Sequence, residues 1–465
     1  MSQSTSPVSS REPVIEQLHS ILGDRLSTSS SVLEQHGRGE SWHPVMAPDA
    51  VCFVQNNAEV AGIISLCAET STPVIAFGTG TSLEGQVQAL KGGICIDLSQ
   101  MNRVIEVNNE DMDCRVQAGV TRLALNQYLS DSGLFFPVDP GANTSIGGMA
   151  ATRASGTNAV RYGTMRENVL GLTVVLANGE IIKAGTRARK SAAGYDLTRL
   201  FVGSEGTLGV ITEVCLRLYG LSEAISAAIV NFPDIRSAAE ATIQTIQMGI
   251  PMARIEILDS TYMKAINNYS KTSYAELDTL FLEFHGTAAA VAEQVQMFDE
   301  ISREFGANGF QWAQKEEDRA RLWRARHDAY YAGLAVNPGS QGYVTDVCVP
   351  ISRLADCIDE TRKDIAASGL FAPILGHVGD GNFHATVFID PGDENMLQKT
   401  RAFDERLVQR ALEMGGTCTG EHGIGMGKLM HMRNEHGDGA IETMQAIKSA
   451  LDPLNIMNPG KVVDC

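Results

Sequence analysis

The sequence has little positive charge and no long apolar run, and both shortages exclude classes of protein. Lysine and arginine number 37 against 55 aspartate and glutamate, which gives a net charge of -18 and argues against a protein that coats nucleic-acid phosphates. The longest apolar stretches, such as residues 60–67 and 170–177, fall short of the roughly 18 residues that a membrane-spanning helix requires. We therefore expect a globular protein without a transmembrane helix.

Paired cysteines and a targeting segment are also absent. The nine cysteines are scattered, their number is odd and no CxxC pair occurs, which indicates reduced thiols and neither a disulfide framework nor a thiolate zinc site. The first eighteen residues have no apolar core and only one arginine, Arg11, which argues against a secretory signal and a mitochondrial transit peptide. We expect a chain that starts near Met1 and a cytoplasmic protein, with peripheral contact at the inner face of a membrane as an alternative.

The pattern of apolar residues divides the chain. A short amphipathic helix is predicted within an N-terminal segment, residues 1–44. Strands, helices and glycine-rich stretches alternate over residues 45–222, and an Asn-Gly dipeptide at 178–179 predicts a hairpin. Residues 223–420 follow a β-α-β-β-α-β order, which predicts an α+β fold with an antiparallel sheet and helices on one face. The last segment, residues 421–465, is expected to return to the first domain.

Three glycine-rich segments stand out in the first domain. Residues 76–86 follow an apolar strand, residues 141–163 are small and polar, and residues 203–214 run into another strand. Such backbone can approach a ligand closely, and its amides can hold a phosphate. For one segment alone a flexible turn is an equally good interpretation. Three segments together favour a large cofactor bound in an extended pose.

A second group of residues carries ligand chemistry. His377 and His384 flank a Gly-Asp-Gly turn, and Glu421 stands beside His422 in another glycine-rich stretch. Imidazole and carboxylate suit Zn²⁺ or Mn²⁺, and three protein ligands leave positions open for a substrate. His422 is then a candidate general base, because its ordinary pKa lies near neutrality. The five histidines at positions 19, 36, 43, 431 and 436 are interpreted as surface residues.

One predicted helix, from Glu316 to about Ala335, combines arginine with aromatic residues. Trp323, Arg326 and Tyr330 are spaced i, i+3, i+7 and would share one face, where the arginine could hold a carboxylate by two parallel contacts. We treat these three as candidate substrate-binding residues. For Arg321 and Arg324 the better interpretation is a solvated charge.

The glycine-rich segments resemble a known cofactor domain. AFGTGTSLEG, PVDPGANTSIGG and GSEGTLGVITEV are similar to the FAD-binding domain of the vanillyl-alcohol oxidase and p-cresol methylhydroxylase superfamily. The resemblance implies a two-part FAD-binding domain over residues 45–222, with a substrate or cap domain over residues 223–420. It implies non-covalent FAD, because the first segment holds no histidine. The residues implied to bind FAD are Phe77, Gly78, Thr79, Gly80, Thr81, Ser82, Pro140, Gly141, Thr144, Ser145, Gly147, Gly148, Ser155, Gly156, Tyr162, Gly163, Glu205, Gly206, Gly209, Ile211 and Asn458.

Motifs of the second half narrow the resemblance. LWRARH, TDVCVPISRL, GHVGDGNFH, TGEHGIG and LDPLNIMNPGK are similar to FAD-linked D-2-hydroxy-acid dehydrogenases, most of all to those of the cytochrome-dependent D-lactate type. This implies a metal bound by His377, His384 and Glu421, with His422 as base. It also implies that Arg326 holds the substrate carboxylate and that Asn382 lies near the substrate. Val344 and Thr345 lack the basic group expected for a second carboxylate, which favours a monocarboxylate.

The expected reaction is oxidation of a small D-2-hydroxy acid, D-lactate to pyruvate in the first instance, by hydride transfer to FAD. Three alternatives remain from the sequence: a dehydrogenase of the same fold for glycolate or D-2-hydroxyglutarate, a zinc hydrolase, and a non-catalytic flavin-binding subunit. The electron acceptor is left open among a cytochrome, a quinone and an electron-transfer flavoprotein, and a homodimer is left open as well.

Overall fold

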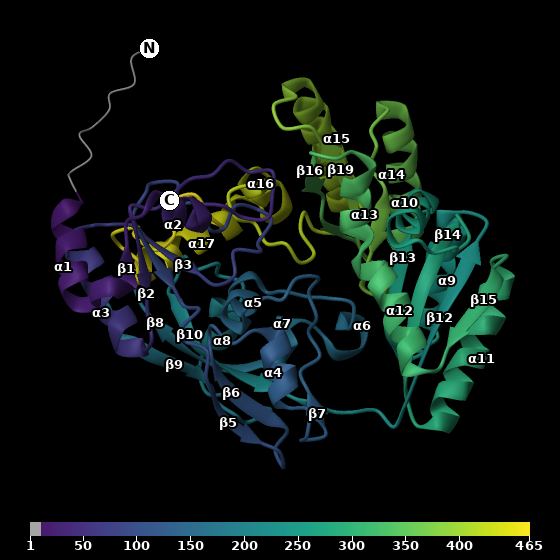
Figure 1. The fold of residues 1–465 in the computed structure, drawn as a ribbon, viewed down its shortest axis with the longest axis horizontal. Helices are drawn as coiled ribbons and strands as arrows, with labels where there is room; N and C mark the ends of the chain where they lie inside the picture. The colour runs from purple at the N-terminus through teal and green to yellow at the C-terminus, as the bar shows by residue number, and fades with distance from the viewer. Residues whose placement is uncertain (1–10) are drawn as a thin grey trace.

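The computed structural model describes residues 11–465, so the first ten residues of the predicted N-terminal segment lie outside the described part. Figure 1 shows two bodies side by side: one combines the N-terminal half with the C-terminal segment, and the other is formed by the middle of the chain. Both contain helices and antiparallel strands, which confirms the predicted α+β class. No helix in residues 11–465 is long and apolar enough to cross a membrane.

The first body opens with a small sheet of four strands in the order β1-β2-β4-β3. β2 and β3, which the helix α3 connects, both pair in parallel with β4, and the side chains of these three strands are almost all buried. The side chain of Asn56 caps α3 by accepting the backbone N–H of Glu59. The elements are α1 (Glu12–Leu22), β1 (Leu26–Ser27), α2 (Ser30–His36), β2 (Ala50–Phe53), α3 (Asn57–Glu69), β3 (Val74–Phe77) and β4 (Ile94–Asp97).

A five-stranded antiparallel sheet, ordered β5-β6-β10-β8-β9, completes the first body. The hairpin predicted at Asn178 and Gly179 joins β8 to β9. Residues 141–163, the second glycine-rich segment, contain two short helices, of which α5 packs on β10. The elements are β5 (Val104–Asn108), β6 (Asp113–Gln117), α4 (Arg122–Tyr128), β7 (Leu134–Phe135), α5 (Ile146–Thr152), α6 (Ala159–Tyr162), α7 (Met165–Asn168), β8 (Val169–Val175), β9 (Ile181–Gly185), α8 (Leu197–Phe201), β10 (Val210–Arg217) and β11 (Tyr219–Gly220).

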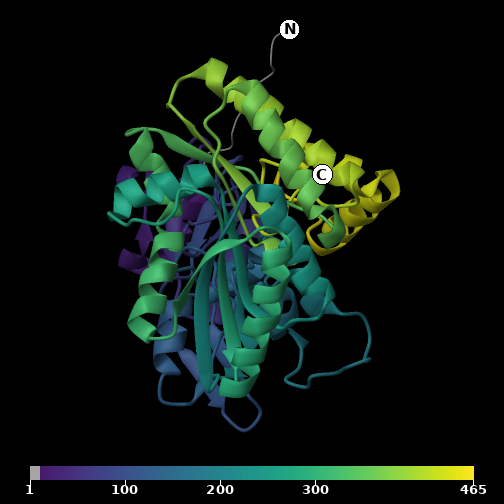
Figure 2. The same ribbon diagram turned by 90° about the vertical axis from the view of Figure 1, so that its right-hand side faces the viewer.

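The second body is built on an eight-stranded antiparallel sheet, seen with its covering helices in Figure 2. Seven strands follow the order β15-β12-β14-β13-β18-β19-β16, and β17 pairs with β19. The strands are β12 (Ala224–Phe232), β13 (Met252–Leu258), β14 (Asp278–Gly286), β15 (Asn308–Ala313), β16 (Gln341–Val344), β17 (Val347–Cys348), β18 (Ile374–Gly376) and β19 (Asn382–Ile389). The boundary predicted at residue 222 falls between β11 and β12.

Helices cover both faces of this sheet, whereas the sequence pattern predicted one covered face. Alternate residues of β12 belong to different apolar clusters: Ala228 and Val230 pack with one group of helices, and Ala227 and Ile229 with the other. The strands are therefore apolar on both sides, which a period-two pattern does not reveal. One group comprises α9 (Ile235–Gln247), α11 (Ala288–Glu304), α14 (Leu354–Ser368) and α15 (Glu394–Glu413), and the other α10 (Ser260–Ser270), α12 (Glu316–His327) and α13 (Ala329–Val336).

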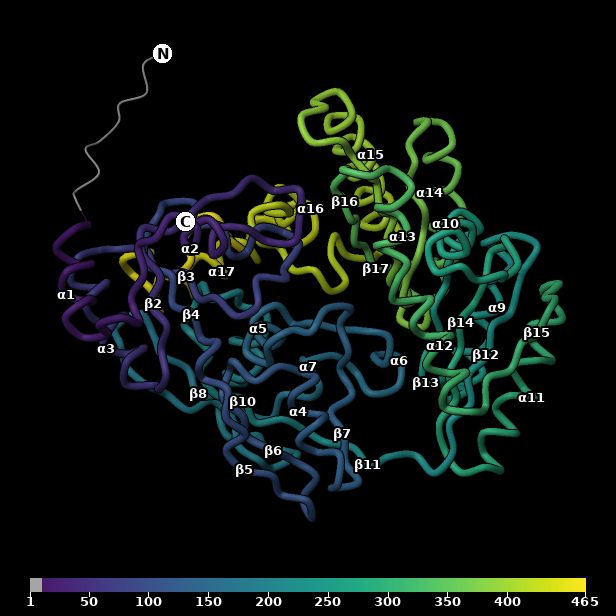
Figure 3. The backbone as a smooth tube through the Cα atoms, in the orientation of Figure 1, coloured from purple at the N-terminus to yellow at the C-terminus, as the bar shows by residue number. Residues whose placement is uncertain are grey.

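The C-terminal segment lies against the N-terminal body, as the tube in Figure 3 shows. After α16 (Leu429–His436) and α17 (Asp438–Leu451), the chain pairs with the start of β3. The amide of Val74 donates to the carbonyl of Ile456, and the amide of Asn458 donates to the carbonyl of Val74. Residues from the two ends of the sequence therefore share one apolar core.

Candidate active site

A cavity of about 740 Å³ is lined by residues of both bodies. This volume lies in the range of roughly 300–1,000 Å³ that is usual for ligand pockets. Most of the predicted FAD-binding residues line it: Phe77, Gly78, Thr79, Gly80, Thr81, Ser82, Pro140, Gly141, Thr144, Ser145, Gly147, Gly148, Ser155, Glu205, Gly206, Gly209, Ile211 and Asn458. The candidate metal ligands, His422, Arg326 and Tyr330 line the same cavity.

Three predicted FAD contacts do not line the cavity: Gly156, Tyr162 and Gly163. The hydroxyl of Tyr162 lies 3.0 Å from Nδ1 of His285, and its ring packs against other aromatic rings at the junction of the two bodies. Gly156 is confined by the backbone of Asp139, since a Cβ there would lie 2.5 Å from that residue's carbonyl carbon. Gly163 ends α6 in a left-handed conformation. These three residues serve backbone packing and the junction.

Two glycines permit close approaches of the chain at the cavity wall. A Cβ on Gly147 would lie 2.5 Å from Cβ of Ala118, a fixed atom, so this position requires glycine. A Cβ on Gly78 would lie 2.2 Å from Oγ of Ser145, so any larger residue would displace that hydroxyl. Through the contact of Gly78 with Ser145, the first two cofactor segments lie side by side in the cavity lining.

The polar groups of this wall suit a pyrophosphate. Oγ of Ser82 and Oγ1 of Thr144 are buried and have no hydrogen-bond partner within residues 11–465, although both residues line the cavity. Buried hydroxyls normally find a partner, so these two indicate one that the ligand supplies. Neither of the first two segments brings a lysine or arginine to the cavity; amides and hydroxyls are the available donors.

The predicted metal ligands come together at the opposite side of the cavity. Nε2 of His377 lies 3.1 Å from Oε1 of Glu421, and Nε2 of His384 lies 3.3 Å from the same oxygen. One ligand atom of each residue falls within 4.8 Å of the other two. His377 follows β18, His384 lies in β19, and Glu421 comes from the loop after α15, so the sheet register brings these ligands together.

The other ring nitrogen of each imidazole, Nδ1, also has a partner in the protein. Nδ1 of His377 lies 2.7 Å from Oε1 of Glu256, and Nδ1 of His384 lies 3.0 Å from the carbonyl of Thr345. Burial alone would lower the pKa of His377, but the carboxylates of Glu256 and Glu421 hold it well above its usual value. The two carboxylates therefore favour a positive charge at this position. Histidines oriented in this way by a carboxylate or carbonyl are typical of metal ligands. The three residues fit Zn²⁺ or Mn²⁺ by donor type and proximity.

His422 lies directly beside this cluster. Its ring stacks on that of His384 at a centroid distance of 4.9 Å and an interplanar angle of 7°. Its Nδ1 is buried without a hydrogen bond, and the nearest carboxylate oxygen with which it pairs, Oε1 of Glu84, is 3.9 Å away. Burial lowers the pKa of His422 to about 4, against the opposing effect of Asp346. The imidazole is therefore neutral at neutral pH and able to accept a proton.

The single helix predicted to carry the substrate-binding residues is divided into two. The structure has two helices, α12 and α13, that meet at Asp328. Arg326 and Tyr330 line the cavity, but Trp323 does not. The indole N–H of Trp323 donates to Oε2 of Glu283, and the guanidinium of Arg254 lies over its ring at 4.6 Å. Trp323 thus contacts side chains of the sheet and lies outside the predicted substrate site.

The two-pronged contact expected of Arg326 is made to a protein carboxylate. Nε and Nη2 of Arg326 donate to Oε2 of Glu256 at 3.0 and 2.7 Å, and Glu256 is fully buried. Glu256 therefore connects Arg326 to His377. Nη1 of Arg326 has no hydrogen-bond partner among the described residues and remains available to a ligand in the cavity.

Asn382 also lies outside the cavity lining. Its Nδ2 donates to Oδ1 of Asp346 and to the carbonyl of Val347, each at 2.7 Å. Its role in the structure is to hold Asp346, a residue that the sequence analysis did not single out. Asp346 with His384 and His422 forms a second group that could hold a metal. The carboxylate oxygens of Asp346, however, already accept four hydrogen bonds, which leaves this group poorly suited to an ion.

Other corrections concern buried charged groups. His36, His43 and His431, interpreted as surface residues, are buried, and Nε2 of His36 lies 2.8 Å from Oδ2 of Asp97. Glu256 was overlooked, although a carboxylate in the apolar stretch RIEIL is itself a signal, because buried charges need partners.

Comparisons with known proteins agree with this geometry. The FAD binding domain family matches residues 48–185, and the family described as FAD linked oxidases, C-terminal domain, matches residues 221–462. A probable mitochondrial D-lactate dehydrogenase of Danio rerio is 54% identical, over 97% of this chain and 92% of the relative. The mitochondrial D-lactate dehydrogenase [cytochrome] of Arabidopsis thaliana is 46% identical, over 97% and 80%. Glycolate oxidase subunit GlcD of Bacillus subtilis is 34% identical, over 89% of each chain.

Solved structures share the fold. A 4-ethylphenol oxidase from Gulosibacter chungangensis superposes with a TM-score of 0.78 over 100% of this chain and 99% of the other, at 17% identity. A p-cresol methylhydroxylase with substrate bound gives a TM-score of 0.75 over 97% of each chain, at 16% identity. The resemblance expected from the glycine-rich segments is thereby confirmed at the level of the fold.

Proposed function

The chain belongs to the FAD-linked oxidases, and from this premise we propose that it oxidises a small D-2-hydroxy acid, with D-lactate as the preferred substrate and pyruvate as the product. One observation carries the proposal: the cluster of His377, His384 and Glu421, with His422 beside it, opens into the cavity that the glycine-rich loops line. Proton removal and cofactor binding thus share one enclosed site.

The charge of the cavity favours a monocarboxylate. Among the described residues that line it, Arg326 is the single lysine or arginine. Arg326 shares its guanidinium with Glu256 and has Nη1 to offer to a substrate carboxylate. A second substrate carboxylate would find no second lysine or arginine in this lining, which includes the apolar side chains of Val344 and Leu375. This argues against D-2-hydroxyglutarate and supports D-lactate, whose methyl group suits an apolar wall.

The proposed chemistry assigns separate tasks to the chain. When bound, FAD supplies the hydride acceptor, and a divalent metal held by His377, His384 and Glu421 supplies a Lewis acid. His422 takes the proton of the substrate hydroxyl, because its imidazole is neutral and has no strong partner at Nδ1. Arg326 fixes the carboxylate and so orients the substrate in the cavity.

A glycolate oxidase is the second candidate, supported by the 34% identity to a glycolate oxidase subunit. Glycolate has no substituent to place against Val344 and Leu375. The two candidates are separated by a panel of D- and L-2-hydroxy acids scored by anaerobic bleaching of the flavin. We expect D-lactate to bleach it at the highest kcat/KM. Bleaching by glycolate or by an L-acid ahead of D-lactate would contradict the proposal. The zinc-hydrolase alternative has no support in the family matches.

A cytochrome is the proposed electron acceptor, because three of the similar dehydrogenases carry that acceptor in their names. Reduced protein mixed with a c-type cytochrome, a quinone and an electron-transfer flavoprotein in parallel should reduce the cytochrome fastest. The cytoplasmic location remains a proposal from the N-terminal sequence. It is open to test by cell fractionation, since several similar proteins are named as mitochondrial.

A further inference from the structure

The loop of residues 417–428 carries both Glu421 and His422, yet it forms no helix or strand of its own. Such a loop needs another source of rigidity if a metal ligand and a base are to keep their places. Residues outside the loop must therefore hold its backbone.

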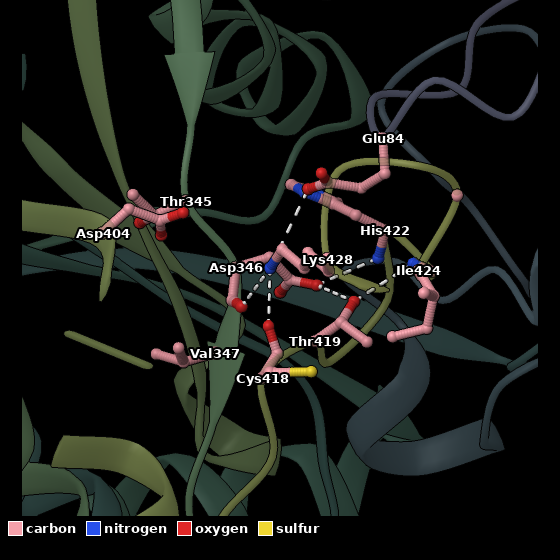
Figure 4. Close-up of polar contacts among 12 residues, drawn as sticks. Glu84, Thr345, Asp346, Val347, Asp404, Cys418, Thr419, His422, Ile424 and Lys428 are labelled. Carbon is pink, nitrogen blue, oxygen red and sulfur yellow. Dashed lines mark hydrogen bonds and ion pairs between the residues drawn. The ribbon is translucent and has the colours of Figure 1, made fainter. Parts of the chain in front are cut away.

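The buried side chain of Asp346 holds the backbone amides of the two functional residues of the loop. Oδ2 of Asp346 accepts hydrogen bonds from Oγ1 of Thr419 at 2.7 Å and from the backbone N–H groups of Glu421 and His422 at 2.9 Å each. Its other oxygen accepts the amide of Asn382. Figure 4 shows Thr419, His422 and Lys428 gathered around this carboxylate.

The carboxylate of Asp346 also lies near His384, and the buried cation Lys428 contacts the backbone of Asp346. Oδ1 of Asp346 lies 3.6 Å from Nδ1 of His384, whose ring stacks on that of His422. Nζ of Lys428 donates to the backbone carbonyls of Asp346 and Cys418, which closes the loop at its base. Both side-chain oxygens of Asp346 accept hydrogen bonds from N–H or O–H donors, as a carboxylate does.

We infer that Asp346 is the positioning residue of the active site. One of its oxygens accepts hydrogen bonds from the consecutive backbone amides of Glu421 and His422, and this fixes the metal ligand and the base relative to each other. The inference rests on the proposed function for the roles of Glu421 and His422. The hydrogen bonds that it concerns exist independently of that function.

The isosteric change Asp346→Asn tests this without altering shape. Both oxygens of Asp346 accept hydrogen bonds. In either orientation, the NH₂ group of an asparagine at this position would therefore face a donor, either the amide of Asn382 or the backbone amides of the loop. Asp113→Asn is the matched control. Asp113 is also buried and accepts from an asparagine amide at 2.8 Å, but it lies in β6 of the other body.

The first measurement is hydrogen exchange of the peptide that spans residues 417–426, in the FAD-loaded protein with its metal removed by a chelator. Exchange should be about tenfold faster or more in Asp346→Asn and unchanged in Asp113→Asn, since local opening depends on the lost hydrogen bonds. The second is metal affinity, titrated with Zn²⁺ and with Mn²⁺, which should fall roughly 10–100-fold in Asp346→Asn alone. At saturating metal, kcat should fall more than KM rises.

Several outcomes would overturn the inference. Wild-type exchange and metal affinity in Asp346→Asn would do so, and so would loss of one whole bound ion with unchanged loop exchange, because Asp346 would then be a ligand. If Asp346→Asn fails to fold, Thr419→Val removes one donor from the same oxygen and should give a smaller effect of the same sign. No change in that folded variant would equally refute the inference. Absence of turnover in the wild-type protein would refute the proposed function and leave the exchange and metal results standing.

Discussion

At the scale of single residues, the chemistry depends on how each functional group is held. His377, His384 and Glu421 face one another because Glu256 and Thr345 hold the far sides of the two imidazoles. The residue types were visible in the sequence, and their partners were not. Partners such as Glu256 lie 121 positions away from His377 in the chain, beyond the reach of any local pattern.

The assignment of His377 as a metal ligand predicts that His377→Ala loses the metal. One of three ligands and the partner of Glu256 disappear together, so metal content and activity should both fall to background. Elemental analysis of the purified protein measures the first. His19→Ala, on the exposed face of α1, is the control and should keep both. Normal metal content in His377→Ala would exclude this residue as a ligand.

The role of His422 predicts a different pattern. His422→Ala should keep FAD and metal, because His422 is not one of the three ligands and His384, on which its ring stacks, is still held by the carbonyl of Thr345, yet substrate should no longer bleach the flavin. General-base catalysis contributes typically 10²–10⁴-fold, so a rate loss of about that size is expected. Stopped-flow absorbance at saturating substrate measures it. Wild-type bleaching would remove His422 as the base.

At the scale of elements, the position of glycine decides where loops can meet. Local patterns predicted the glycine-rich segments, and the structure adds the reason: Gly78 lies against Ser145, far along the chain. The opposite lesson comes from the helix predicted across residues 316–335. Two helices meet at Asp328 in its place, and no proline or glycine at that position signalled the division. Trp323 lies outside the cavity although Arg326, on the same helix, lines it.

The contact at Gly78 predicts that Gly78→Ala impairs FAD binding. A Cβ at 2.2 Å from Oγ of Ser145 displaces that hydroxyl, which caps α5 and belongs to a residue of the cavity lining, so the ratio of flavin to protein absorbance should fall. Gly62→Ala is the control, because that glycine is exposed within α3 and a Cβ there meets nothing within 4 Å. This variant should keep its FAD and gain up to about 1 kcal/mol in stability. Full flavin content in Gly78→Ala would contradict the close approach.

At the scale of the whole molecule, the site exists because two bodies meet. Oε1 and Oε2 of Glu205, from a glycine-rich segment of the first body, accept the amides of Ile424 and Gly425. Gln86 donates to the carbonyl of His422 in the same loop. Burial raises the pKa of Glu205 to about 7, although the two amides oppose this effect. The loop of residues 417–428 is thus held by carboxylates of both bodies, Glu205 and Asp346.

Arg254 provides a test of the junction. It lies in the second body, and its guanidinium pairs with Asp139 of the first body and with Glu283 of its own sheet. Arg254→Met should destabilise the protein by about 3–5 kcal/mol, because two buried carboxylates lose their cation. Denaturant unfolding measures this loss. Arg321→Met, which removes an exposed pair with Asp318, should change stability by less than about 1 kcal/mol.

The difference in stability between wild type and Arg254→Met should depend on pH in a definite direction. Burial would raise the pKa of Glu283, but Arg254 and other partners lower it below the ordinary value. Such a carboxylate contributes stability above its unfolded-state pKa and loses that contribution as the pH falls through its folded-state pKa. The stability gap between wild type and Arg254→Met should therefore be full at neutral pH and narrow as the pH falls below about 4, near the ordinary glutamate pKa. A gap that widens in acid would contradict this assignment.

The sequence by itself determined the local features of this protein: its α+β class, its glycine-rich segments, and the histidines and glutamate with metal-ligand chemistry. These features follow from residue type and short spacing, which the chain carries without reference to distant parts. The tertiary structure alone decided that Asp346 and Glu256 hold the site, that Arg326 is shared with a carboxylate, and that Trp323 and Asn382 stand outside the cavity. Each of these depends on sheet register and on burial of charge between distant segments, and no local pattern encodes such pairing.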